Sequence, residues 1–400
     1  MTKNSKRKIW HHPWGYPEGS LIAFGLLLTG FLLDFSTGQA FPKPPFPWNV
    51  SLFMLLISVL IVAHLNKKSS PFIRWLSSVP AAISALVLFT FISVLMGLVP
   101  QKNMGVPSPS NLLDSWAYFF SYIYLLVVLG LSSLKRIWPL EKRNAAYLLN
   151  HLGLWLALAA AGLGAGDIQQ YNMFLTEGKT TWYGYQGKNE TIELPFALRL
   201  NDFTLENYPA KIALVDPKTK AILRSAGKPA LTDLPLDKLK TIKGFEILAT
   251  DYLDFAVIDS LSNFIPLIDT GAVQAARLTV NGAVRGWVSP GNFRFPMRIV
   301  PISDTLAIAM LKPEAKRYAS DVTVFLPDQQ QYPELIEVNK PIEVEGWKIY
   351  QSDYDERFGR WSRHSILEIV RDPWLPLVYV GFYMMIIGAI LLIFQGKKTK

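Results

Sequence analysis

The stretch NHLGLWLALAAAGLGAGD, from Asn150 to Asp167, decides the architecture of this chain. It is apolar and carries no acidic or basic residue before Asp167, apart from one histidine near its start. At about 1.5 Å per residue, a helix of roughly 20 such residues spans a bilayer. Apolar runs dominate the sequence before this stretch, and a long polar segment follows it. The stretch therefore marks the boundary between a predicted membrane region and a predicted soluble domain.

The histidine in this stretch, His151, is the first candidate site residue. An imidazole in lipid is costly unless it is paired or ligated, so a histidine in a membrane helix points to function. In one interpretation His151 is an axial ligand of haem iron, which accepts a neutral imidazole in an apolar cleft. In the other it is an interfacial histidine that caps or hydrogen-bonds. His64, which ends an earlier apolar run, is a candidate second ligand, and a ligand from a partner subunit is the simpler alternative.

Composition narrows the function classes further. The 400 residues are 50% hydrophobic and only 18% charged, with 12 Trp, which indicates a membrane protein with one soluble part. The absence of Cys excludes disulfides, zinc–thiolate sites, thiol redox catalysis and thioether attachment of haem to this chain. The net charge of +9 comes from Lys and Arg beside apolar runs, a pattern of membrane topology rather than of nucleic-acid binding.

Working outward from His151, the chain contains six predicted transmembrane spans. Basic residues cluster in the N-terminal tail, in 66–79 and in 135–143, whereas 36–49 and 100–114 carry one Lys each. The positive-inside rule then places both termini in the cytoplasm and 167–371 outside. The spans cover about 19–35, 50–65, 80–99, 115–134, a run starting near 144, and 374–395.

The predicted fold class is a polytopic α-helical membrane protein with a large β-rich extracytoplasmic domain between the fifth and sixth spans. The domains are a cytoplasmic tail (1–19), a five-helix region (20–166), the β-rich domain (167–371), and a final helix with a basic cytoplasmic tail (372–400).

Short β-branched or alternating runs predict strands in the outer domain, and Asn281-Gly282 predicts a hairpin turn. We expect a β-sandwich-like domain, with a short helix as an option at 236–242 or 258–267. The predicted strands cover 192–200, 276–280, 284–288, 322–326 and 347–350.

The outer domain contains no recognisable catalytic set, so no catalytic residue is predicted. Its histidine, His364, lacks a nucleophile partner, and Asp251, Asp254 and Asp259 do not match a calcium loop. Core packing is the favoured role of its aromatic residues, with a binding face as the alternative. These residues are Trp287, Phe293, Phe295, Trp347, Tyr350 and Tyr354.

Two features near the span ends favour structural roles. Gly162, Gly164 and Gly166 permit close helix packing in lipid. Asp372 is a good N-cap before the last span, followed by Pro373 at the first helical position and Trp374 at interfacial depth.

With these pieces placed, the chain resembles the ResB/CcsB family of cytochrome c biogenesis proteins from about Ile83 to its C-terminus. The resemblance is carried by MGLVPQ (96–101), NHLGL (150–154), VNKP (338–341) leading to GWKIYQS (346–352), and ILEIVRDP (366–373).

The resemblance implies a System II subunit in the bacterial inner (cytoplasmic) membrane, with its large domain on the periplasmic face. Such a subunit works with a CcsA/ResC-like membrane partner to bring haem b to apocytochrome c, and a thiol-disulfide reductant protein keeps the acceptor thiols reduced. His151 falls on the family's transmembrane histidine, which implies a transient axial haem ligand whose counterpart lies on the partner. The chain would then be a non-catalytic or haem-ligating part of a cytochrome c synthetase (haem lyase) complex.

Two departures from the family pattern stand out. The spans within about 19–65 precede the four that the family usually has, and the tryptophan-rich outer loop of the partner is absent. Two other functions remain as alternatives. One is a membrane scaffold whose outer domain docks apocytochrome or a thiol reductant, and the other is a solute transporter, which requires broken helices with polar residues at the midplane.

Overall fold

The computed structural model describes residues 10–100, 111–137, 141–187, 190–225, 227–234, 236 and 238–396. The basic residues of 1–9 and 397–400, which support the predicted cytoplasmic ends, lie outside this range, as does most of the predicted outer loop at 100–114. The chain divides into a helical unit, Met1–Ile168 with Asp372–Lys400, and a β-rich unit, Gln169–Arg371. Each unit is described by itself.

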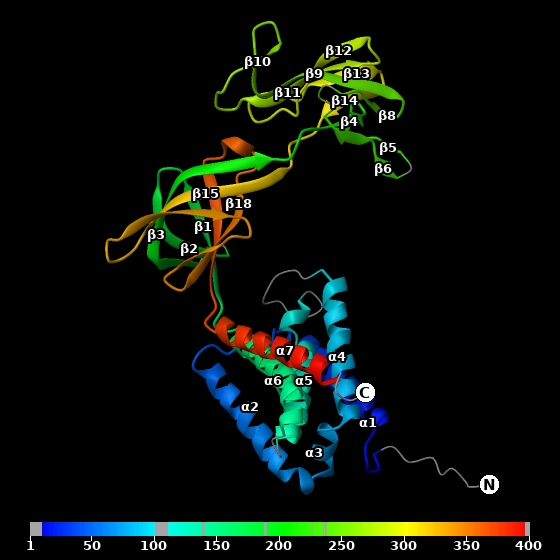
Figure 1. The fold of residues 1–400 in the computed structure, drawn as a ribbon, viewed down its shortest axis with the longest axis vertical. Helices are drawn as coiled ribbons and strands as arrows, with labels where there is room; N and C mark the ends of the chain where they lie inside the picture. The colour runs from blue at the N-terminus through cyan, green and yellow to red at the C-terminus, as the bar shows by residue number, and fades with distance from the viewer. Residues whose placement is uncertain are drawn as a thin grey trace, which may run out of the picture. The chain divides into compact units, whose positions relative to one another are not determined.

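Among its described residues, the helical unit contains six helices that are long and apolar enough to cross a membrane (Figure 1). This confirms the six predicted apolar helices and is the pattern of a multi-pass membrane protein. The sequence did not predict the short helix α3, whose first turn is capped by the Ser70 side chain. The helices are α1 (Tyr16–Thr37), α2 (Trp48–Leu65), α3 (Pro71–Leu76), α4 (Val79–Leu98), α5 (Trp116–Ile137), α6 (Ala145–Gly164) and α7 (Leu375–Gly396), with short 3-10 turns η1 (Asn66–Lys68), η2 (Leu112–Asp114) and η3 (Lys142–Asn144).

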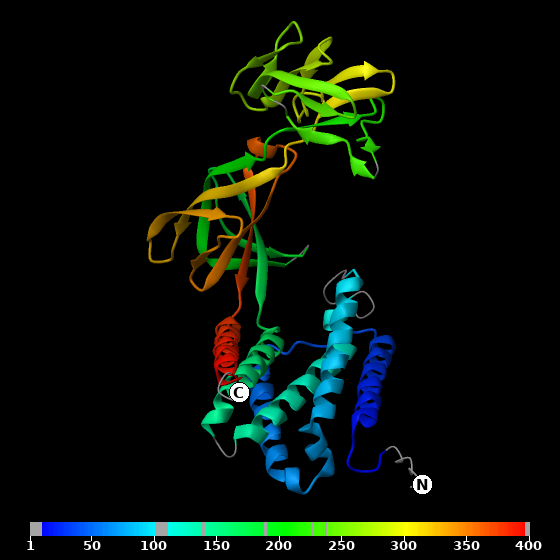
Figure 2. The ribbon, with the colours of Figure 1, turned by 45° about the vertical axis from the view of Figure 1, so that its right-hand side comes forward.

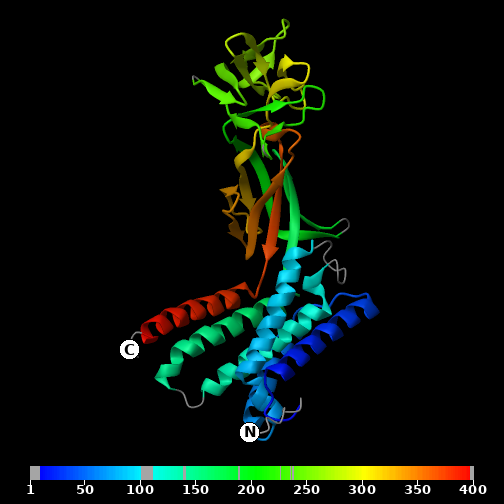
Figure 3. The same ribbon diagram turned by 90° about the vertical axis from the view of Figure 1, so that its right-hand side faces the viewer.

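Helices α6 and α7 lie side by side and meet through glycines (Figure 3). A Cβ atom added to Gly381 of α7 would lie 2.6 Å from the Gly153 carbonyl oxygen and from the Ala157 backbone nitrogen of α6. Asn150 adds a hydrogen bond of 3.1 Å from its Nδ2 to the Met385 carbonyl oxygen. The absence of side chains lets the two backbones approach, as is common where lipid supplies no hydrophobic driving force.

The predicted small-residue contacts at the far end of α6 are also present. A side chain at Gly162 would clash with Tyr122 of α5, one at Gly164 with Trp374, and one at Gly166 with the backbone of Pro44. Each of these glycines therefore sits where a neighbouring segment crosses α6 closely.

Asp167 ties three segments of the helical unit together. Its Oδ2 accepts hydrogen bonds from Asn49 Nδ2 (2.7 Å) and Trp374 Nε1 (2.8 Å), and its Oδ1 accepts one from the Phe46 backbone N–H (2.7 Å). Asn49 has no exposed surface and also donates to the Leu163 carbonyl oxygen. The start of α2, the end of α6 and the start of α7 thus share one carboxylate.

The start of α7 lies two residues later than predicted, because the helix begins at Leu375 and not at Pro373. Asp372 Oδ1 accepts hydrogen bonds from the backbone N–H groups of Trp374 (3.0 Å) and Leu375 (3.1 Å). A carboxylate in this position satisfies donors that a helix leaves unpaired in its first turn. The role of Asp372 is therefore structural.

The β-rich unit has two lobes. The first lobe is one eight-stranded antiparallel sheet in the order β16-β15-β3-β2-β1-β19-β18-β17, and its outermost strands β16 and β17 contact each other. It encloses a core that includes Met173, Leu198 and Trp347. Its strands are β1 (Gln169–Thr176), β2 (Thr180–Gln186), β3 (Glu190–Asn207), β15 (Ala315–Phe325), β16 (Gln331–Glu337), β17 (Ile342–Val344), β18 (Trp347–Tyr354) and β19 (His364–Arg371), with the turn η4 (Gly359–Trp361) before β19.

The second lobe is formed by the middle of the unit, from green to yellow in Figure 2. A sheet in the order β10-β9-β11-β12, with β8 also paired to β9, and a sheet in the order β13-β14-β4-β7 share one core. The strands are β4 (Lys211–Val215), β5 (Arg224–Ser225), β6 (Lys228–Pro229), β7 (Leu231–Asp233), β8 (Lys240–Ile242), β9 (Phe245–Ile258), β10 (Phe264–Pro266), β11 (Val273–Val280), β12 (Val284–Val288), β13 (Ile299–Ser303) and β14 (Leu306–Met310).

Two sequence expectations change here. The optional helix was wrong at both places, because 240–242 forms β8, and 245–258 and 264–266 form the β9–β10 hairpin. The sandwich describes the second lobe only, since the first lobe is a single sheet closed around its own core. The predicted hairpin turn at Asn281-Gly282 is confirmed, with both residues at positive φ between β11 and β12.

Candidate functional site

His151 lies on the first half of α6, partly buried, on the same helix face as Tyr147. The imidazole stacks on the Tyr147 ring with 3.7 Å between centroids and 24° between planes. The guanidinium of Arg136, near the end of α5, lies 3.9 Å from the centroid of the same tyrosine ring. Arg136 and Tyr147 were not predicted as neighbours of His151, although a spacing of four residues places Tyr147 on its face of the helix.

The hydrogen bond of His151 fixes its protonation pattern. Its Nδ1 lies 3.1 Å from the Tyr147 carbonyl oxygen, one helical turn earlier. A carbonyl oxygen only accepts, so Nδ1 carries the proton, and in the neutral imidazole the lone pair is on Nε2. Within the described part of the chain, Nε2 has no hydrogen-bond partner. This is the arrangement in which a protein histidine binds a metal, with one nitrogen held by a backbone carbonyl and the other free.

His64, the other histidine considered as a haem ligand, is engaged differently. Its Nε2 lies 3.0 Å from Lys67 Nζ, and its Nδ1 is buried without a partner among the described residues. An ammonium group only donates, so Nε2 of His64 accepts from Lys67 and its lone pair is occupied. His64 therefore has a local partner that His151 Nε2 lacks.

The titratable groups of the outer domain are scattered. Nδ1 of His364 lies 3.2 Å from Thr176 Oγ1 at the paired ends of β19 and β1. Asp259 accepts backbone hydrogen bonds from Leu261 and Asn263 in the β9–β10 turn. Among the residues that the structure describes, no three of His, Cys, Asp or Glu come together as a metal site.

Asp254 is the exception among the three aspartates, since it belongs to a compact network. Its carboxylate accepts Arg360 Nη1 (2.9 Å) and Nη2 (3.0 Å), and Gln274 Nε2 (3.0 Å). Burial opposes the charge on Asp254, but the hydrogen bonds from Arg360 and Gln274 outweigh it and lower the pKa of the carboxyl. These partners lie 20 and 106 residues away, and no local pattern predicts them.

The outer-domain aromatic residues divide between the two roles considered for them. Trp347 is 4% exposed and belongs to the first-lobe core, and Trp287 packs beside Phe264 in the second lobe. Phe293, by contrast, is 46% exposed and lines a cleft together with Phe295 and Tyr354. Core packing thus accounts for the tryptophans, and a binding face remains open for the cleft residues.

Comparison with known proteins finds a similarity over part of the β-rich unit. A search among curated proteins found no match. A family profile described as the ResB-like family matches residues 303–363, which include the VNKP and GWKIYQS phrases but not His151. Over these residues the chain is similar to the ResB-like family.

Proposed function

We propose that this protein is the ResB/CcsB-like subunit of a System II cytochrome c biogenesis complex and that it holds haem through His151. The family match carries the functional class, and the His151 geometry names the residue. The complex would sit in the bacterial cytoplasmic membrane, with both termini of this chain in the cytoplasm and the β-rich unit on the periplasmic side. A CcsA/ResC-like subunit would bring the second axial ligand, and a thiol-disulfide reductant would keep the acceptor thiols of apocytochrome c reduced.

The residues around His151 fit an iron porphyrin. The Tyr147 carbonyl keeps the Nδ1 proton in place and orients the ring, which leaves Nε2 to ligate. Arg136 supplies a positive charge close to the same face, and a carboxylate side arm of a porphyrin is a suitable counterion. Bound haem would supply the vinyl groups that react with cysteines of the acceptor, while this chain holds the macrocycle.

Absorption spectroscopy tests this proposal. The protein is purified with its CcsA/ResC-like partner as wild type, His151→Ala and, as a matched control in the same helical unit, His64→Ala. We expect His151→Ala to lose most of the haem absorbance and added imidazole to restore it, because imidazole replaces the missing ligand. His64→Ala should retain haem. Unchanged haem in His151→Ala would refute ligation by His151. A loss of haem in both variants would mean that the second ligand is His64 of this chain and not a residue of the partner.

A second candidate function is a membrane scaffold whose outer domain docks apocytochrome or a thiol reductant. The observation that favours it is the cleft lined by Phe293, Phe295 and Tyr354, a pocket on the β-rich unit apart from His151. This role predicts that the wild-type haem spectrum survives substitution of His151, while changes in the outer domain weaken the complex. Co-purification of the partner, measured beside haem content for the same variants, separates the two functions.

A further inference from the structure

The β-rich unit contains a cleft of about 600 Å³. One wall is the connection between β18 and β19, including Tyr354, Phe358 and η4. The opposite wall is the loop at 290–297 together with the start of β11. A volume of this size is within the range of ordinary ligand sites.

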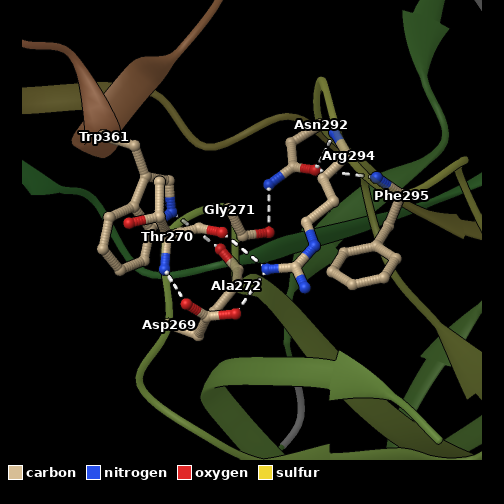
Figure 4. A network of polar contacts seen from close by, with 8 residues as sticks. All are labelled: Asp269, Thr270, Gly271, Ala272, Asn292, Arg294, Phe295 and Trp361. Atoms are coloured by element: carbon tan, nitrogen blue, oxygen red, sulfur yellow. Dashed lines mark hydrogen bonds and ion pairs between the residues drawn. The ribbon is translucent and has the colours of Figure 1, made fainter.

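The walls of the cleft are fastened to each other. Trp361 of η4 donates from Nε1 to the Ala272 carbonyl oxygen at 2.9 Å (Figure 4). The neighbouring Arg360 donates hydrogen bonds from two nitrogens to the Asp254 carboxylate. Its guanidinium lies over the Phe255 ring, 4.7 Å from the ring centroid. A bidentate pair and an indole hydrogen bond hold the connection against the second lobe, so the cleft does not require the ligand to form it.

The loop that forms the second wall is also held by hydrogen bonds (Figure 4). Asn292 donates from Nδ2 to the Gly271 carbonyl oxygen (2.8 Å) and accepts at Oδ1 from the backbone N–H groups of Arg294 and Phe295. Arg294 bonds to Asp269 Oδ2 (2.6 Å) and to the Thr270 carbonyl oxygen (2.7 Å). The hydrogen bond from Arg294 lowers the pKa of Asp269, so this clamp persists at neutral pH.

Two exposed aromatic rings of the cleft lining contact each other. Phe293 is 46% exposed and Phe358 is 38% exposed, and their ring centroids lie 4.8 Å apart. They come from opposite walls, and together they form one exposed apolar surface. Such a pair offers an apolar side chain a surface on which to lose water.

Gln274 adds an unsatisfied acceptor to the lining. It is 6% exposed, and its Oε1 is buried with no hydrogen-bond partner among the described residues. Its amide cannot be turned around, because Nε2 must face the Asp254 carboxylate. A buried acceptor without a donor costs free energy, so a ligand N–H that reaches Gln274 is favoured.

The charged residues that line the cleft are Lys312, Arg357, Arg360 and Glu356. Arg360 and Arg357 are neutralised by Asp254 and Asp355. Lys312 is exposed and forms no ion pair within the described range. A carboxylate is the natural partner for its ammonium group.

We propose that this cleft binds an extended polypeptide segment that carries alternating apolar and acidic side chains. An apolar side chain packs on the Phe293–Phe358 pair, a backbone N–H donates to Gln274, and an acidic side chain pairs with Lys312. An extended peptide supplies all three groups at once, since its backbone donors repeat regularly and successive side chains point to opposite sides. This inference rests on the docking role proposed above and gives that role a surface and a chemistry.

Fluorescence anisotropy with the full-length protein in detergent tests the proposal. The probe is a short fluorescein-labelled peptide of alternating phenylalanine and aspartate, and the comparison probe has lysine in place of aspartate. The first probe should bind with an affinity that falls as salt is added, and the second should bind much more weakly. Equal binding of both probes, or no binding of the first, would overturn the proposal.

Substitutions locate the binding. We expect Lys312→Glu to weaken binding of the acidic probe about tenfold and Phe293→Ala to weaken it about fivefold, because each removes one recognised group. Lys228→Glu, which changes an exposed lysine of the same unit outside the cleft, should leave the affinity within about twofold. Unchanged affinity in both cleft variants would place the peptide elsewhere. Haem absorbance recorded on the same samples with the partner present distinguishes a failure of this proposal from a failure of haem ligation.

Discussion

In the helical unit, α6 and α7 meet at positions that have no side chain, whereas the first lobe of the β-rich unit closes around large ones. Gly153 and Gly381 bring backbone against backbone, while Leu198, Trp347 and their neighbours fill the interior of the sheet. The difference follows from the surroundings. Water drives apolar side chains together in the β-rich unit, but lipid gives helices no such drive, so close contact and a few polar bonds must hold them.

The comparison has a consequence for tolerance to mutation. A sheet core distributes its stability over many contacts, and an exposed ion pair adds little to it. A glycine contact or a shared carboxylate concentrates stability in a few atoms. We therefore expect the largest effects of small changes in the helical unit and the smallest at the charged surface of the β-rich unit.

Gly381→Ala should have the largest effect. The added Cβ would lie 2.6 Å from backbone atoms of α6, which cannot rotate away, so the helices must separate. We expect a loss of about 3 kcal/mol or more in stability, the upper end for overpacking, because the close atoms belong to the backbone. The measurement is the thermal unfolding midpoint of the full chain in detergent.

The matched control for this prediction is Gly25→Ala in α1, where an added Cβ meets nothing within 4 Å. It should be neutral or slightly stabilising, because alanine has the higher helix propensity. Equal midpoints for the two variants would show that close approach of α6 and α7 is not what holds the helical unit together.

Asp167→Ala should have the next largest effect. It leaves the Asn49 amide, the Trp374 indole N–H and the Phe46 backbone N–H without their shared acceptor. Loss of hydrogen bonds to a charged group costs about 1.5–3 kcal/mol. The same unfolding assay measures it, with Asp167→Asn as the variant that keeps an acceptor oxygen. A midpoint as low for Asn as for Ala would mean that the charge, and not the hydrogen bonds, joins the three segments.

Glu337→Gln should have the smallest effect and a distinct pH dependence, because Glu337 is itself 9% exposed but its partners Arg317 and Lys340 are exposed side chains. Hydrogen bonds from Arg317 and then from Lys340 lower the pKa of Glu337 in the folded protein. A carboxyl with a lowered folded pKa contributes stability above its unfolded value of about 4.3, and this contribution disappears as pH falls through the folded value.

The substitution should therefore weaken the first lobe slightly at pH 7 and make its stability less sensitive to acid below about pH 4. Limited proteolysis at several pH values, with peptides from β15 and β16 identified by mass spectrometry, measures this. Glu193→Gln, an exposed carboxyl on β3, is the control. If the variant loses stability in acid to the same extent as wild type does, Glu337 does not contribute to the pH dependence of the first lobe's stability.

The parts of the fold that were predicted correctly are those that depend on residues adjacent in the sequence. Each span is an uninterrupted apolar run, and the Asn281-Gly282 turn needs only two residues that accept positive φ. The second lobe shows why the optional helices failed, because 240–242 pairs with 245–247 and 264–266 pairs with 256–258 in the sheet. Tertiary pairing of this kind overrides a weak local preference.

Of the candidate site, the sequence predicted only His151, which can be recognised from the sequence of a single helix. His151 stands out because histidine is rare in an apolar run, and its stacking on Tyr147 follows from their spacing on α6. The position of Arg136 over Tyr147, by contrast, depends on how α5 ends against α6. No local sequence pattern predicted the cleft. Gln274, Arg360 and Trp361 meet only after β11 and η4 are placed, and each is an ordinary residue in its own segment.

Strands β1 and β19 pair in continuous register from Gln169 with Arg371 to Thr176 with His364, although they open and close the β-rich unit. In the order of synthesis, β1 is the first strand made and β19 the last, so their ladder forms only when the whole unit has left the ribosome. Contacts between distant parts of a chain are slow to form, and an unpaired strand edge is prone to aggregate until they do. Biosynthesis of this protein therefore includes an interval in which β1 is complete but lacks one neighbour, and folding helpers on the side of the β-rich unit would act during that interval.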